Sequence, residues 1–134
     1  MDKKALILIV DDHEEYRKLL AWLVELHGFQ TISAIDGREA VALATECQPD
    51  LVLMDLNMPN MNGYEATRAI HAHRLGRKIP VIAVSVDCRE YGFETWAFEA
   101  GFSAFLPKPF EPEALLEIIK GVLASSVEQR RRAA

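Results

Sequence analysis

The sequence contains little cysteine. Its two cysteines, Cys47 and Cys88, are far apart in the chain and lack the close spacing of a zinc-binding or redox motif. A thiolate metal site and a catalytic cysteine are therefore not expected. We expect both residues to be free, buried thiols.

Long apolar runs and an excess of basic residues are also missing. No stretch approaches the roughly 20 apolar residues of a membrane-spanning helix, and the early run ALILIV is too short for a signal peptide. The 15 basic residues are outnumbered by 20 acidic ones, and the resulting net charge of -5 works against binding to nucleic-acid phosphates. We therefore expect a cytoplasmic protein without direct nucleic-acid or membrane partners.

What the sequence does contain is a series of short apolar runs of strand length. They are ALILIV at 5–10, QTISA at 30–34, LVLMD at 51–55, VIAVS at 81–85 and AFL at 104–106. The first, third and fourth are apolar at consecutive positions, which is typical of parallel strands covered by helices on both faces. With 134 residues, the chain is long enough for one buried core and too short for two ordinary domains.

The stretches between these runs have helical periodicity. Gly28 follows the first amphipathic stretch, and Asp36 precedes the second as a candidate N-cap. Alternating strands and helices predict a doubly wound α/β domain with a five-stranded parallel sheet and five helices. In the flavodoxin-like order 2-1-3-4-5, which we expect here, the first and third strands are neighbours. The last helix is expected from Pro112 to about Ala124. We therefore predict a domain at 1–124 and a polar, basic C-terminal tail at 125–134.

Polar residues gather at one edge of this predicted sheet. In open α/β sheets, ligands bind beyond the carboxyl ends of the strands. The residues at those ends are Asp11 and Asp12 after the first strand, Asp55 at the end of the third, Ser85 at the end of the fourth and Lys108 after the fifth. Taken singly, each has an ordinary interpretation, such as a helix-capping aspartate or a strand-end hydroxyl. Together they predict one site.

The residue types at this edge suit metal and phosphate chemistry. Three carboxylates repel one another unless a cation lies between them, and Mg²⁺ prefers oxygen ligands while leaving positions for a substrate phosphate. An aspartate can attack phosphorus when cations offset its charge. Asp55 lies nearest the middle, Lys108 would supply charge to the phosphoryl oxygens, and Ser85 would supply a hydrogen bond.

Four segments of the sequence resemble a known family. They are VDD at 10–12, LVLMDLNMPNMNGYE at 51–65, VIAVS at 81–85 and AGFSAFLPKPF at 100–110. They resemble the receiver domains of two-component response regulators, of which the chemotaxis regulator is one, and the resemblance covers about residues 5–124. It implies a domain that accepts a phosphoryl group and catalyses only its own phosphorylation and dephosphorylation, not an enzyme acting on external substrates.

The resemblance assigns roles at the site. It implies that Asp55 is the phosphoacceptor and also a ligand of a Mg²⁺ ion, which Asp11 and Asp12 arrange directly or through water. The backbone carbonyl of Asn57 would complete the protein ligands. Lys108 would read the phosphate.

The resemblance also implies a switch. Ser85 would read the phosphate and couple it to the aromatic residue Phe105, whose inward rotation reshapes the face formed by helix four, strand five and helix five. A cis peptide bond before Pro109 would aim the lysine into the site.

Partners follow from the same resemblance. The phosphodonor is expected to be a histidine kinase or a histidine-containing phosphotransfer protein that contacts Glu14, Arg17, Pro109 and Phe110. A downstream protein would receive the signal. Trp96 faces away from the inward positions of helix four, so it either marks this output surface or folds back onto the helix body.

Two features depart from the family pattern. Val86 follows Ser85 where most receivers have Ala or Gly, and its bulk is expected to slow the acceptance of small phosphodonors. The segment from Ser85 to Lys108 is one residue longer than usual, with Gly92 where helix four should start. We therefore expect helix four to begin late or irregularly.

Three other functions are alternatives to a receiver domain. An aspartyl-phosphate phosphatase or mutase needs a second aspartate at the position of Asn57. A flavin or nucleotide module needs glycines or hydroxyls after the first strand, where this chain has DDHEEY, whose acidic residues would repel phosphate. A pseudo-receiver, which keeps the fold as an interaction module without phosphorylation, is the alternative that Val86 leaves open.

Overall fold

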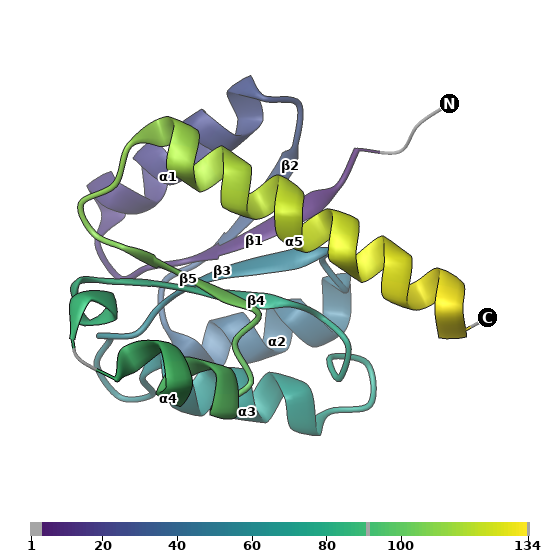
Figure 1. Cartoon of the computed structure of the whole chain (residues 1–134). Coiled ribbons are helices and arrows are strands. Elements are labelled where there is room, and N and C mark those ends of the chain that lie inside the picture. Colours follow the sequence, from purple (N-terminus) through teal and green to yellow (C-terminus); the bar gives the residue numbers. More distant parts are fainter. Residues whose placement is uncertain (1–3, 91, 134) are drawn as a thin grey trace.

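The computed structural model describes residues 4–90 and 92–133 of the chain. Its centre is a sheet of five parallel strands in the order β2-β1-β3-β4-β5, as predicted (Figure 1). The strands are β1 (Leu6–Val10), β2 (Gln30–Ala34), β3 (Leu51–Asp55), β4 (Val81–Ser85) and β5 (Ala104–Pro107). Each overlaps the apolar run from which it was predicted.

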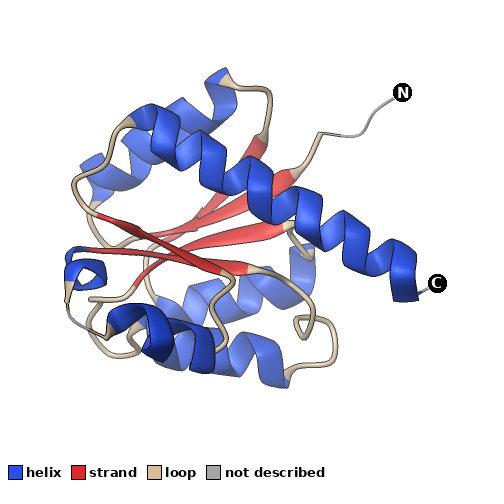
Figure 2. Ribbon diagram, viewed as in Figure 1, coloured by secondary structure: helices blue, strands red, loops and turns tan. Residues whose placement is uncertain are grey.

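Helices cover both faces of the sheet (Figure 2). They are α1 (Glu14–Leu26), α2 (Gly37–Cys47), α3 (Gly63–Ala72), α4 (Phe93–Glu99), α5 (Pro112–Ala133) and the short 3₁₀ helix η1 (Val86–Arg89). The helices α1 and α5 pack on one face, and α2, α3 and α4 pack on the other. This arrangement confirms the predicted doubly wound α/β fold.

The strand β1 shows why its apolar residues are consecutive. Leu8 and Val10 belong to the core under α2, α3 and α4, whereas Ile7 and Ile9 belong to the core under α1 and α5. Successive side chains of a strand point to opposite faces, so a sheet covered on both sides needs apolar residues at every position. Burial of each such side chain stabilises the fold by roughly 1.5–3 kcal/mol.

Side-chain caps fix where two helices begin. Asp36 Oδ1 accepts a hydrogen bond of 2.9 Å from Glu39 N, which confirms the predicted cap of α2. At α3, Asn62 Oδ1 accepts from Glu65 N at 2.8 Å, and Asn62 N donates to Glu65 Oε1 at 3.1 Å. This reciprocal pair is a capping box.

The start of α3 lies directly against the end of β3. Gly63 N donates to Leu56 O at 3.1 Å, and a Cβ atom at Gly63 would lie 2.2 Å from Asp55 O. No side chain fits that space, so glycine is required by the close approach of two backbones. This contact fixes the path of the backbone that follows Asp55.

The segment after β4 is irregular, as predicted. The residues that follow Ser85 form the single turn of η1, and α4 begins only at Phe93. Gly92, just before α4, has a φ of 79°, a backbone conformation that favours glycine. The helix α4 is therefore both late and short, with 7 residues.

Two predictions about the periphery need correction. The helix α5 continues to Ala133 and does not end near Ala124, because the intervening residues include no proline or glycine to stop it. Cys88 is buried as expected, but Cys47 is exposed because it ends α2 on the solvent side. Both thiols are free. The division into a domain at 1–124 and a tail at 125–134 stays a prediction.

Within the described residues, none of the helices combines the length and the apolar character needed to cross a membrane.

Candidate functional site

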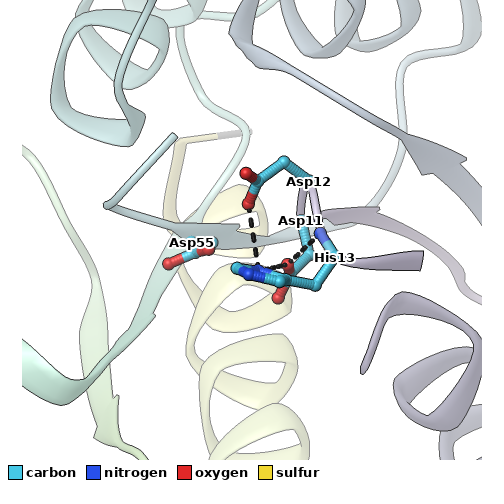
Figure 3. A group of neighbouring side chains, drawn as sticks. All are labelled: Asp11, Asp12, His13 and Asp55. Atoms are coloured by element: carbon cyan, nitrogen blue, oxygen red, sulfur yellow. Dashed lines mark hydrogen bonds and ion pairs between the residues drawn. The ribbon is translucent and has the colours of Figure 1, made fainter. Parts of the chain in front are cut away.

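Three carboxylates meet at the carboxyl ends of β1 and β3. Asp11 and Asp12 follow β1 directly, and Asp55 is the last residue of β3. One ligand atom from each, together with one from His13, all lie within 4.8 Å of one another (Figure 3). Asp11 and Asp55 are buried, with 1% and 5% of their surface exposed. The predicted convergence of these residues is thus found in the structure.

Burial and the repulsion between like charges destabilise the ionised carboxylates of this site. Burial raises the pKa of Asp55, the Lys108 ammonium group opposes the rise, and the neighbouring Asp11 carboxylate adds to it. Asp12 Oδ1 is buried and accepts no hydrogen bond, although His13 Nδ1 lies 3.3 Å away. A buried carboxylate oxygen without a donor is the position that a cation would satisfy.

The lysine is the cation that the structure itself supplies. Lys108 Nζ lies 3.1 Å from Asp11 Oδ2 and 3.9 Å from Asp55 Oδ2. Lys108 N also donates to Ser85 O at 3.1 Å, which ties the β5–α5 loop to the end of β4. The peptide bond between Lys108 and Pro109 is cis, as the resemblance implied.

Tyr16 forms one wall of the site, which the sequence did not reveal. The ammonium group of Lys108 lies 4.1 Å from the centre of the Tyr16 ring. Burial, and then the charges of Asp11 and Asp55, raise the pKa of Tyr16 to about 12. The sequence gives no sign of this position, because nothing in the helical period distinguishes a core aromatic from one beside a charged pocket.

A small hydrogen-bond network connects the site to η1. Asn57 Nδ2 donates to Ser85 Oγ at 3.3 Å and to Asp87 Oδ2 at 3.0 Å. Asp87 N donates to Ser85 Oγ at 3.2 Å, and Asn57 N donates to Asp55 Oδ1 at 3.2 Å. Asp87 was not predicted as a site residue, because its position depends on the fold of the irregular segment after β4.

Residues expected at the phosphodonor surface have varied surroundings. Glu14 is exposed and pairs with Lys18 at 2.9 Å, and the lysine lowers the pKa of its carboxyl. Arg17 Nη1 donates to Asp11 O at 2.8 Å, so this arginine supports the backbone of the site. Phe110 is half-buried, and its ring lies 6.2 Å from that of Tyr16. The contact of these residues with a partner stays a prediction.

The aromatic residues of the predicted output region lie close together. The half-buried Phe105 ring lies 5.5 Å from Phe93 of α4. The Trp96 ring, 41% exposed, lies against Tyr64, Phe93 and Phe102 at centroid distances of 5.5, 5.2 and 6.0 Å. Trp96 therefore covers the helix body with one face while part of the ring meets solvent.

Comparison with known proteins identifies the class of domain. The protein-family model of the response regulator receiver domain matches residues 7–120. The chain belongs to this family. It is thus a signalling domain that combines the acidic pocket with Lys108, as a phosphoacceptor receiver does, and it is not a conventional enzyme.

Two of the similar proteins are regulators with about the length of one receiver domain. Protein PilH of Pseudomonas aeruginosa is 41% identical over 120 residues, which cover 90% of this chain and 98% of PilH. The polar-differentiation response regulator DivK of Brucella ovis is 37% identical over 120 residues, which cover 90% of this chain and 97% of DivK.

Solved structures show the same fold. The chemotaxis protein CheY4 of Vibrio cholerae superposes with a TM-score of 0.83 at 29% identity, covering 90% of this chain and 99% of CheY4. The receiver domain of the sensor histidine kinase PA1611 of Pseudomonas aeruginosa gives 0.83 at 30% identity, covering 91% and 99%, and that structure has a magnesium ion coordinated in its active-site cleft.

Proposed function

We propose that Asp55 accepts a phosphoryl group from a phosphohistidine protein in the cytoplasm, with Mg²⁺ bound by Asp11, Asp12, Asp55 itself and the backbone carbonyl of Asn57. The observation that carries this proposal is the position of Asp55. It is a buried carboxylate beside two further carboxylates and 3.9 Å from a lysine ammonium group.

The side chains present fit a magnesium ion. Carboxylate oxygens are the hard ligands that Mg²⁺ prefers, and the buried Asp12 Oδ1 accepts no hydrogen bond. The PA1611 receiver, 30% identical, holds magnesium in its cleft. When bound, the ion would neutralise negative charge on the carboxylates and the incoming phosphoryl group.

The transfer itself needs little more than position and charge. A carboxylate oxygen of Asp55 forms the new O–P bond, while the N–P bond of the phosphohistidine breaks and the imidazole nitrogen keeps the electron pair and takes up a proton. Lys108 exchanges its contact with Asp11 for a phosphoryl oxygen. Ser85 Oγ only accepts in its bonds from Asn57 and Asp87, so its hydroxyl proton can be donated to another phosphoryl oxygen.

Movement of Ser85 would start the switch. Ser85 is the last residue of β4, and Phe105 lies on the neighbouring strand β5, where it pairs with Ala83. The Phe105 ring contacts Phe93 of α4, so inward rotation of Phe105 would change the packing of α4. A downstream protein would read this change on the face formed by α4, β5 and α5.

The phosphodonor would dock beside the site on α1. Leu19, Trp22 and Leu26 are 47%, 57% and 59% exposed and are spaced three and four residues apart, so they form one apolar stripe on this helix. Such a stripe fits a helix of a histidine kinase or phosphotransfer protein. Glu14 and Arg17 lie in the first turn of α1, and Pro109 and Phe110 lie in the loop between β5 and α5. These four residues would border the contact.

The first experiment is a titration of wild type and Asp55→Asn with Mg²⁺ and then beryllofluoride, a stable mimic of a phosphoryl group. Amide NMR shifts report each residue. We expect a saturable response in wild type that is lost in Asp55→Asn and extends to Phe105. Absence of any response in wild type would contradict phosphorylation and favour the pseudo-receiver.

A further inference from the structure

A second pocket lies beside the acidic site, between the loop after β3 and the start of α4. Its volume is about 420 Å³. Its walls include the aromatic side chains of Tyr64, Phe93 and Trp96, and its rim includes the carboxylates of Asp87 and Glu90. Asn57, whose backbone carbonyl is a proposed Mg²⁺ ligand, also lines the pocket, but none of these five residues is such a ligand. The pocket therefore needs an explanation of its own.

The aromatic rings form a continuous wall. Trp96 is central, with ring centroids of Tyr64 and Phe93 at 5.5 and 5.2 Å. Trp96 remains 41% exposed although three rings pack against it. The Arg68 guanidinium group, which does not line the pocket, lies 5.7 Å from the centre of the Tyr64 ring, so this ring already makes one cation–π contact.

The charge at the rim has one sign. Among the side chains that the structure describes, no lysine, arginine or histidine forms an ion pair with Asp87 or Glu90. Asp87 Oδ2 is held by a neutral donor, the side-chain amide of Asn57, at 3.0 Å. Two carboxylates in a pocket that is also lined by aromatic rings attract a cation with a flat, weakly hydrated surface.

We propose that this pocket binds an arginine side chain of a partner protein. The guanidinium group stacks on aromatic faces and donates to carboxylates in a planar geometry, whereas a lysine ammonium group is more strongly hydrated and makes point contacts. A phosphate or an acidic peptide would be repelled by Asp87 and Glu90. A purely apolar ligand would leave both carboxylates at the rim without a counter-charge.

The pocket and the phosphoacceptor site share hydrogen bonds, so the arginine would sense the state of Asp55. Asp87 Oδ2 accepts a hydrogen bond from Asn57 Nδ2, and Asp87 N donates a second one to Ser85 Oγ. Movement of Ser85 toward a phosphoryl oxygen disturbs the second bond and changes the rim. Binding free energies are reciprocal, so arginine binding changes the affinity for the phosphoryl mimic by the same factor. This coupling rests on the proposed function, whereas arginine binding itself does not.

The test uses the full chain and the peptide acetyl-Gly-Arg-Gly-amide, followed by amide NMR. We expect saturable shifts around the pocket at millimolar peptide. The same peptide with citrulline, the neutral isostere of arginine, should bind at least about tenfold more weakly. Equal shifts from both peptides, or no saturable shift from the arginine peptide, would overturn the proposal.

Variants locate the binding. Trp96→Ala and the milder Glu90→Gln should each weaken binding of the arginine peptide at least roughly threefold. Phe98→Ala is the matched control, because Phe98 is an aromatic residue of the same helix, is 80% exposed and does not line this pocket. Unchanged binding in Glu90→Gln together with loss in Phe98→Ala would place the peptide elsewhere and reject the pocket.

The coupling has a separate readout. Repeating the titration with Mg²⁺ and beryllofluoride should change the dissociation constant of the peptide at least about threefold in wild type and leave it unchanged in Asp55→Asn. An unchanged constant, despite shifts from beryllofluoride itself, would reject the coupling and leave phosphorylation intact. Peptide binding without any beryllofluoride response would instead reject the proposed function and leave the pocket.

Discussion

Lys108 and Asp11 form an ion pair of 3.1 Å between residues that are 97 positions apart in the sequence. Only 17% of the lysine side chain and 1% of the aspartate side chain are exposed. The pair joins the loop after β5 to the end of β1 across the middle of the sheet. The lysine is therefore part of the folded core of the site before any phosphate is bound.

Replacing this lysine should destabilise the fold. In Lys108→Met, Asp11 and Asp55 lose the cation that offsets their charge, and the free energy of unfolding should fall by about 2 kcal/mol. Urea unfolding without Mg²⁺ measures the change. Lys18→Met is the control, because Lys18 pairs with Glu14 at an exposed position and should change stability by less than about 0.5 kcal/mol. Equal effects of the two substitutions would contradict the importance of the buried pair.

Replacing Asp55, the proposed phosphoacceptor, should have the opposite effect. Asp55→Asn removes one of the clustered negative charges, keeps an oxygen for the bond from Asn57 N, and should raise the free energy of unfolding by about 1–2 kcal/mol without Mg²⁺. Glu15→Gln, which removes the same charge from an exposed position of α1, should change it by less than about 0.5 kcal/mol. A loss of stability in Asp55→Asn would show that Lys108 already overcompensates the cluster.

A methyl group at Gly63 should disturb both the helix and the site. The added Cβ of Gly63→Ala would lie 2.2 Å from Asp55 O, so the backbone must move, and we expect a loss of about 2–3 kcal/mol with weaker beryllofluoride binding. In Gly121→Ala the new Cβ meets nothing within 4 Å in the middle of α5, and stability should increase by roughly 0.5–1 kcal/mol. Thermal unfolding of both variants distinguishes steric conflict from helix propensity.

The residue after Ser85 should control access for small phosphodonors. Val86 begins η1 and is 57% exposed, and its branched side chain is expected to narrow the approach to Asp55. Val86→Ala should then accept phosphate from acetyl phosphate about threefold faster, a difference of about 0.6 kcal/mol in the barrier. Val86→Thr keeps the shape and should leave the rate unchanged. Equal rates in wild type and Val86→Ala would reject this hypothesis.

The sequence predicted the strands well because burial on both faces leaves a simple pattern. Every residue of β3 is buried, so its apolar run is uninterrupted and its end at Asp55 is clear. The three aspartates and Lys108 were also predicted, because the carboxyl ends of parallel strands converge. The wall made by Tyr16 and the bond from Asn57 to Asp87 were missed. They depend on side-chain directions and on the path of an irregular segment, and neither leaves a periodic signal in the sequence.

The length of α5 shows another limit. Its end was expected where the apolar pattern stops near Ala124, yet the helix runs to Ala133. Apolar periodicity reports which turns are buried, whereas the end of a helix depends on stop signals such as glycine and proline. A solvated turn of residues that are compatible with a helix has neither apolar periodicity nor a stop signal.

The position of Asp55 at the end of the central strand has a consequence for dynamics. β3 is hydrogen-bonded to β1 and β4 along its length, so its amides should exchange with solvent only when most of the domain opens. The negative charge that Asp55 would gain on the proposed phosphorylation would thus arrive at an anchored point of the backbone. A large displacement is then expected in η1 and α4, where Gly92 has a positive φ of 79° just before α4. We therefore expect β3 to stay fixed, while η1 and α4 open locally at a lower free energy than the sheet.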